Sequence, residues 1–206
     1  MSDMQSVRDD IAFMRALAEE GRSTPLLGGA IMLTAGLVFG GASLAHFIIS
    51  ISGAHLTPWI YPTLWVGAGL VFTVILQLVK ARYRGRAGAQ SPSNRAMRAV
   101  WQGVGSAIFT LFVAFGIAAW KLDNPVVFGL MISTILALYG AAWTLAAKMS
   151  DNKWMGWFAL LSFAFAVMMP LMLDDARIFL VYAAALGLTA ALPGVILMRQ
   201  EPSDIV

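Results

Sequence analysis

The chain has 206 residues, of which 59% are apolar and 12% are charged, and its formal net charge is +3. Soluble domains carry about 25% charged residues, so this composition excludes a soluble enzyme and a disordered tail. The absence of cysteine excludes disulfides, thiolate metal sites and cysteine nucleophiles. We therefore predict an integral membrane protein.

Residues 1–24 precede the first apolar run, and we predict a short cytoplasmic amphipathic helix there. Apolar residues recur at helical spacing along one face, from Met4 to Ala18. Helices that lie on lipid are usually basic, whereas this segment has more acids than arginines. Docking on protein is therefore favoured, either on the mouth of its own bundle or on a partner, with the lipid surface as the remaining alternative. The residues predicted to dock are Val7, Ile11, Phe13, Met14 and Leu17.

Six apolar runs are each long enough to cross a hydrocarbon layer of about 30 Å. Backbone groups in lipid must be hydrogen-bonded within the chain, so we predict helices. The predicted fold is an all-α, polytopic membrane helix bundle with six transmembrane helices in three hairpins. The membrane domain covers residues 25–198 and is followed by a cytoplasmic tail, 199–206. The spans are Pro25–Ser50, Trp59–Val79, Arg98–Trp120, Pro125–Ala147, Trp154–Leu173 and Arg177–Met198.

Helix starts and kinks are also indicated. Capping residues precede proline at Thr24, Thr57 and Asn124, and Asp151-Asn152 and Asp174-Asp175 supply similar caps before the fifth and sixth spans. Pro170 and Pro193 fall inside predicted helices and are expected to kink them.

Lysine and arginine are distributed unequally between the two sides of the predicted bundle. Twelve of the 14 lie on the side of the two termini, and only Lys121 and Arg177 lie on the other. The positive-inside rule then places both termini in the cytoplasm. The short loops favour the bacterial inner membrane.

The loop Lys80–Arg98 has six basic residues and no acid, and its Gly, Pro and Ser residues predict a flexible centre. Its charges hold the loop inside, and they also suit anionic lipid headgroups. We predict headgroup contacts for Lys80, Arg82, Arg84 and Arg86. No phosphate-loop pattern and no aromatic ladder is present, so no nucleic-acid partner is predicted.

Small residues and one histidine stand out inside the spans. Gly36 and Gly40 form a close-approach motif, for packing within the monomer or between copies. His46 is the one histidine inside a predicted span, as a hydrogen-bonded structural residue or as a pH sensor. A haem needs two facing histidines, and no catalytic pattern is present. We predict no enzyme activity, no cofactor and no metal.

The segment Asp10–Arg22, followed by Pro25–Gly29, resembles the start of small bacterial membrane proteins without assigned activity. The three-hairpin layout is similar, in topology alone, to the acid-resistance membrane family HdeD. Neither resemblance implies site residues.

These patterns favour a non-enzymatic inner-membrane scaffold, sensor or regulatory subunit that engages a cytoplasmic or membrane partner. So apolar a chain with short loops is also expected to form a homo-oligomer or to join a larger complex. The alternative is a small passive channel or transporter for a weakly polar solute, which requires polar side chains from several spans to face one cavity.

Overall fold

The computed structural model describes residues 4–5, 7–14, 27–53, 57, 59–83, 91–150 and 152–201, and within these ranges it contains helices and no strand. Six helical segments there are long and apolar enough to cross a membrane, so the chain is a multi-pass membrane protein and the predicted all-α fold is confirmed. The elements are α2 Gly29–Ile51, α3 Ile60–Tyr83, α4 Pro92–Leu122, α5 Val126–Ser150, α6 Lys153–Met168, η1 Met169–Met172, α7 Arg177–Leu186, η2 Gly187–Ala191 and α8 Leu192–Gln200.

The start of α4 differs from the prediction. The helix begins at Pro92 and not at Arg98, because the Ser91 hydroxyl accepts a hydrogen bond from the Asn94 N–H at 3.2 Å and caps the first turn. The predicted flexible loop is therefore wrong for residues 91–98. Residues 84–90 lie outside the described part of the chain.

The start of α2 also differs. Gly28, with a φ of 130°, precedes the first helical residue, so the helix does not begin at Pro25. Glycine adopts this backbone conformation without the strain that a side chain would cause. Thr24 and Pro25 lie outside the described residues. Two further predicted caps are confirmed: Asn124 accepts from the Val126 N–H at 3.0 Å, and Asp175 accepts from the Arg177 N–H at 2.8 Å. The cap predicted at Asn152 is wrong, because Asn152 precedes α6 but its side chain makes no hydrogen bond to the first turn.

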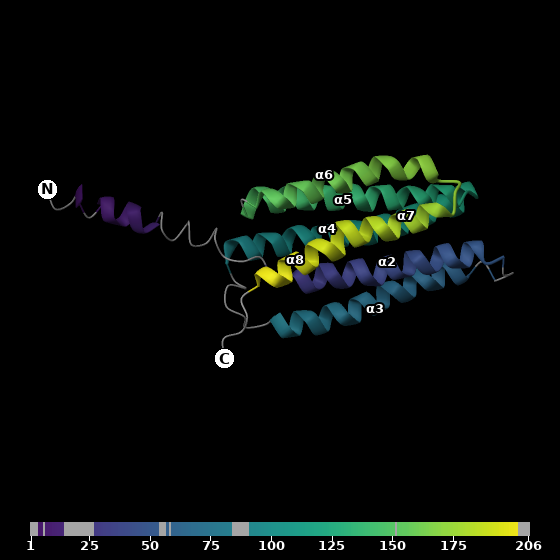
Figure 1. Ribbon diagram of the computed structural model, residues 1–206, viewed down its shortest axis with the longest axis horizontal. Helices are drawn as coiled ribbons and strands as arrows, with labels where there is room; N and C mark the ends of the chain where they lie inside the picture. The colour runs from purple at the N-terminus through teal and green to yellow at the C-terminus, as the bar shows by residue number, and fades with distance from the viewer. Residues whose placement is uncertain are drawn as a thin grey trace.

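The helices lie side by side along the long axis of the molecule (Figure 1). Helix α2 packs on α3 and on the last span, α7–η2–α8, while α5 packs on α4 and α6. Helices α3 and α4 each have one main neighbour, and none of the most apolar stretch of either is buried. The bundle thus has a packed centre and two peripheral helices.

The two prolines predicted to kink helices coincide with departures from α-helical geometry. Pro170 lies in the 3₁₀ turn η1, which continues α6. Pro193 follows the π-helical turn η2, which joins α7 to α8. Proline has no N–H and cannot complete the helical hydrogen-bond pattern, which explains why the geometry changes at these two positions.

The core lies between α5, α6 and the last span. Trp143 and Leu136 of α5, Met155 of α6, Met169 of η1 and Leu186 of α7 are its largest fully buried apolar side chains. The hydroxyl groups of Ser162 and Thr189, which are buried there, donate hydrogen bonds to backbone carbonyls.

Candidate functional site

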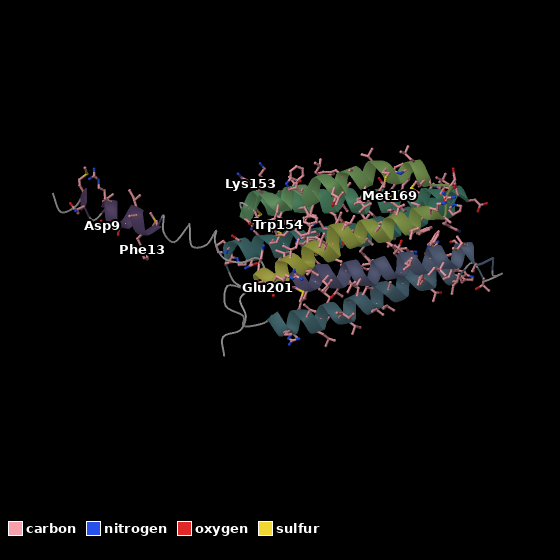
Figure 2. The ribbon with its side chains drawn as sticks, viewed as in Figure 1. Asp9, Phe13, Lys153, Trp154, Met169 and Glu201 are labelled. Atoms are coloured by element: carbon pink, nitrogen blue, oxygen red, sulfur yellow. The ribbon has the colours of Figure 1, made fainter. Side chains whose placement is uncertain are left out.

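One end of the bundle, which we call the basic end, is where α2, α4 and α6 begin and where α3, α5 and α8 end. Figure 2 labels Lys153 and Glu201 at this end, and Met169 toward the opposite one. Among the described residues, the exposed cations of the basic end are Lys80, Arg82, Arg95, Arg98, Lys148, Lys153 and Arg199. At the opposite end, the described cations are Lys121 and Arg177.

Three helix ends are joined at the basic end. The side-chain oxygen of Asn94, on α4, accepts a hydrogen bond from the Leu27 N–H at 2.8 Å. The Glu201 carboxylate, just after α8, accepts from the N–H groups of Gly28 and Gly29 at 3.4 and 3.3 Å. A carboxylate is well placed here, because the N-terminus of a helix has free N–H groups and a partial positive charge.

Sequence reasoning missed both of these joining residues. Asn94 is 4% exposed, although the sequence places it in a polar loop. The Ser91-Pro92 pair, which resembles the other capping pairs, was the available signal. Glu201 falls in the predicted tail, and nothing local indicates its contact with α2.

The N-terminal residues predicted to dock are exposed where they are described. Residues 7–14 are helical, and Val7, Ile11, Phe13 and Met14 are between 44% and 66% exposed, so none packs on the bundle. Figure 1 shows this helix apart from the six spans, and Figure 2 labels Phe13 on it. Leu17 lies outside the described residues.

The predicted headgroup-contacting residues are described in part. Lys80 and Arg82 are exposed in the last turn of α3. Arg84 and Arg86 lie outside the described residues.

The predicted glycine pair lies on a tight seam between α2 and the last span. A Cβ added at Gly36 would stand 2.5 Å from the Ala191 backbone nitrogen, and one at Gly29 would stand 2.6 Å from the Gly194 carbonyl oxygen. Gly40 has more room, 3.6 Å from the Ala183 carbonyl oxygen. Gly36 therefore packs within the monomer, where the absence of a side chain allows the two backbones to approach.

His46 lies in an aromatic cage near the end of the bundle opposite the basic end. Its imidazole stacks on Phe179 of α7, with ring centroids 3.5 Å apart, and on Tyr61 of α3 at 4.3 Å. The Trp65 indole N–H donates to its Nδ1 at 3.0 Å. Nδ1 is therefore unprotonated, and the cage ties α2 to α3 and α7. The pH-sensing role of His46 stays a prediction.

A second aromatic cluster surrounds Trp143. Its ring contacts Trp101, Trp154 and Phe158, with centroid distances of 5.3, 6.5 and 6.1 Å. The Trp154 Nε1 atom is buried and has no hydrogen-bond partner among the described residues. The Trp154 ring packs edge to face against Phe158, with ring centroids 5.6 Å apart, so aromatic packing holds the indole in place.

Three buried hydroxyl groups donate hydrogen bonds to backbone carbonyls of the bundle. Ser43 donates to the Phe179 carbonyl, Ser162 to that of Phe158 and Thr189 to that of Ala185, each at 2.7 Å. The first of these bonds crosses from α2 to α7, and the other two stay within one helix. Such groups stabilise packing in a membrane and are satisfied without a solute.

Within the described ranges, no three His, Asp or Glu side chains gather in a way that would hold a metal ion. Comparisons with protein-family models, with curated proteins and with solved structures found no match to this chain. The resemblances drawn from the N-terminal segment and the hairpin layout therefore stay predictions.

Proposed function

We propose that this protein is a non-enzymatic scaffold, sensor or regulatory subunit of the bacterial inner membrane, which binds a cytoplasmic protein through its N-terminal helix. The observation that carries the proposal is the exposed apolar face of residues 4–5 and 7–14. Met4, Val7, Ile11 and Met14 fall within one side of that helix, and each is at least 44% exposed. An amphipathic helix of this kind presents anchors to an apolar groove.

The charge of the helix favours a protein over the lipid surface as its partner. Arg8, Asp9 and Asp10 are the charged residues of the described N-terminal helix, so acids exceed bases there. Anionic headgroups attract basic helices and give this one no electrostatic gain.

The proposed orientation has the basic end in the cytoplasm, on the positive-inside rule. Because the chain has no cysteine, single cysteines at the exposed Lys153 and Asp123 can be labelled without background. A membrane-impermeant thiol reagent applied to intact inner-membrane spheroplasts is expected to label Asp123→Cys, and to label Lys153→Cys only after lysis. The reverse pattern contradicts the orientation.

Photo-crosslinking in cells tests the docking. A crosslinking amino acid replaces Val7, Ile11 or Met14 in turn, in the full-length chain. The matched control replaces Ala12, which is exposed on another side of the same helix. We expect one protein to be trapped from the apolar face and not from position 12. Equal trapping at all four positions, or crosslinks to lipid alone, contradicts the proposal.

The channel alternative receives less support. A solute path needs polar side chains turned toward a common cavity, whereas Ser43, Ser162 and Thr189 donate to backbone carbonyls. The centre of the bundle holds large apolar side chains such as Trp143 and Leu136.

A further inference from the structure

Two tyrosine side chains of the core carry hydroxyl groups without a hydrogen bond. Tyr139 of α5 is 6% exposed and Tyr182 of α7 is 3% exposed. Buried polar groups in proteins are normally hydrogen-bonded. Neither phenol hydroxyl has a hydrogen-bond partner among the residues that the structure describes, in contrast to the hydroxyls of Ser43, Ser162 and Thr189. The fold therefore leaves both phenols without the partner that it gives to these three groups.

The oxygen atoms of both phenols remain accessible, although the rings are buried. Within the described part of the chain, Trp154 Nε1 is the one side-chain polar atom that is fully buried and has no hydrogen-bond partner. The two phenol oxygens also lack a partner, so they are not fully buried. A molecule from outside the protein can therefore make the missing hydrogen bonds.

The two phenols lie near each other between α5 and the last span. Trp143 follows Tyr139 by one turn of α5, and its indole N–H donates to the Thr189 carbonyl of the last span at 2.9 Å. Leu186 follows Tyr182 by one turn and belongs to the same core. The two phenol oxygens are close enough to interact electrostatically. One place in the core thus has two free hydroxyl donors.

Tryptophans from the two peripheral helices pack against the phenol rings. Trp65 of α3 contacts the Tyr182 ring, with centroids 6.4 Å apart, and Trp101 of α4 contacts the Tyr139 ring edge to face at 5.5 Å. The phenols are therefore surrounded by aromatic rings. Helices α3 and α4 each have one main neighbour, so either helix can shift without unpacking the rest of the bundle.

The charged groups of the bundle lie away from the phenols. Tyr139 is near the middle of α5, whereas the described lysines and arginines of the spans lie near helix ends, and the described acids of the bundle lie in turns or beyond a helix end. A phenol is itself a neutral hydrogen-bond donor near pH 7. An ionic ligand would find no opposite charge here, so the surroundings favour a neutral one.

We propose that Tyr139 and Tyr182 bind a neutral, lipid-soluble molecule with carbonyl oxygens on a flat aromatic ring, of the quinone class. The two hydroxyl groups donate to the carbonyl oxygens, and Trp65 and Trp101 pack against the ring. Ligand sites commonly combine apolar and aromatic walls with a few polar groups. Two hydroxyl groups at one place form a binding site and not a path across the bundle. The site does not involve the N-terminal helix, so it is tested separately from the proposed docking.

Equilibrium dialysis tests the site, with the full-length protein in lipid nanodiscs and empty nanodiscs to subtract partition into lipid. The probes are menadione, a naphthoquinone with two carbonyls, and 2-methylnaphthalene, which has the same ring system without them. The site variant is Tyr139→Phe/Tyr182→Phe, which removes two oxygen atoms and keeps both rings. The matched control is Tyr61→Phe, the same change in the aromatic cage of His46.

We expect the wild type to bind menadione at least about tenfold more tightly than 2-methylnaphthalene, because two hydrogen bonds are added. The site variant is expected to lose about tenfold in affinity for menadione and to bind 2-methylnaphthalene within about twofold of the wild type. Tyr61→Phe is expected to leave both affinities unchanged. Equal binding of the two probes by the wild type, or an unchanged menadione affinity in the site variant, overturns the proposal.

Two further arms test the class of ligand and the state of the hydroxyl groups. Methyl laurate, a flexible ester with one carbonyl, is expected to bind more weakly than menadione, and tighter binding would contradict an aromatic ligand. Because the hydroxyls have no partner in the fold, the site variant is expected to melt at the temperature of the wild type or above it. A clear loss of thermal stability would show that the hydroxyls serve the fold, through an ordered water for example, and would overturn the proposal.

Discussion

The indole N–H of Trp143 donates a hydrogen bond to the carbonyl oxygen of Thr189 at 2.9 Å, from α5 to the π-helical turn of the last span. In a regular helix the N–H four residues later would occupy that oxygen, but here that residue is Pro193. Ser133 and Ala166 repeat the relationship: the Ser133 hydroxyl donates to the carbonyl that Pro170 leaves free. Helix α5 therefore completes the backbone hydrogen bonding of the two spans that contain Pro170 and Pro193, as a bilayer requires.

Replacing Trp143 with Phe is expected to destabilise the bundle by about 1–3 kcal/mol, because it leaves a buried carbonyl without a donor. The measurement is the free energy of unfolding, from denaturing-detergent titration followed by circular dichroism. Trp157→Phe is the control, since Trp157 is 72% exposed and faces lipid.

The loss of ring volume in Trp143→Phe is separated from the hydrogen bond by a second substitution. Pro193→Ala supplies an N–H for the Thr189 carbonyl, so the effect of Trp143→Phe is expected to be smaller in that background. An equal effect in both backgrounds would mean that packing, and not the hydrogen bond, accounts for the destabilisation.

Ser133→Ala is expected to cost about 0.5–1.5 kcal/mol, in the range for hydrogen bonds between membrane helices. Thr134→Ala is the neighbouring control, because the Thr134 hydroxyl bonds to Leu130 within its own helix. The same titration measures both variants. A larger loss for Thr134→Ala would argue against a special role for the carbonyl freed by Pro170.

The seam between α2 and the last span makes Gly36 and Gly41 respond oppositely to alanine. A Cβ at Gly36 would clash with Ala191, and we expect a loss of about 1–3 kcal/mol. A Cβ at Gly41 meets nothing within 4 Å, and alanine there is expected to be neutral or to stabilise the helix by up to about 1 kcal/mol. Thermal unfolding of the two variants in detergent distinguishes them, and similar melting temperatures would contradict the close approach.

Glu201 caps α2 from the other end of the chain. Glu201→Ala is expected to destabilise by about 0.5–2 kcal/mol, as for other lost caps. Glu201→Gln keeps an acceptor oxygen without the charge, so an intermediate loss is expected. Gln200→Ala, at an exposed position of α8, is the control in the same unfolding measurement. Hydrogen exchange at the Gly28 and Gly29 amides should accelerate in Glu201→Ala, and unchanged exchange would count against the cap.

The sequence predicts the six spans well, because an unbroken apolar run of bilayer length has few other solutions. Local signals of the same kind predict the caps at Asn124 and Asp175. The start of α4 at Ser91 follows the same pattern, but the surrounding basic and glycine residues suggested a loop.

Contacts between spans that are distant in the sequence could not be predicted from it. The bond from Trp143 to Thr189 depends on which faces of α5 and the last span meet, and a tryptophan is equally suited to a membrane interface. Glu201 is one acid in a polar tail, and its partner glycines lie at the other end of the sequence. Nothing in local spacing encodes either pairing.

The seam of Gly29 and Gly36 with Ala191 and Gly194 joins the first of the six described spans to the sixth. During synthesis α2 enters the bilayer before the last span, against which it packs, has been made. Its surface at Gly29 and Gly36 is therefore unpaired until α8 has been synthesised. This seam can then close only after the sixth span has been synthesised, and a chain truncated before that span would leave the α2 surface at Gly29 and Gly36 without its partner.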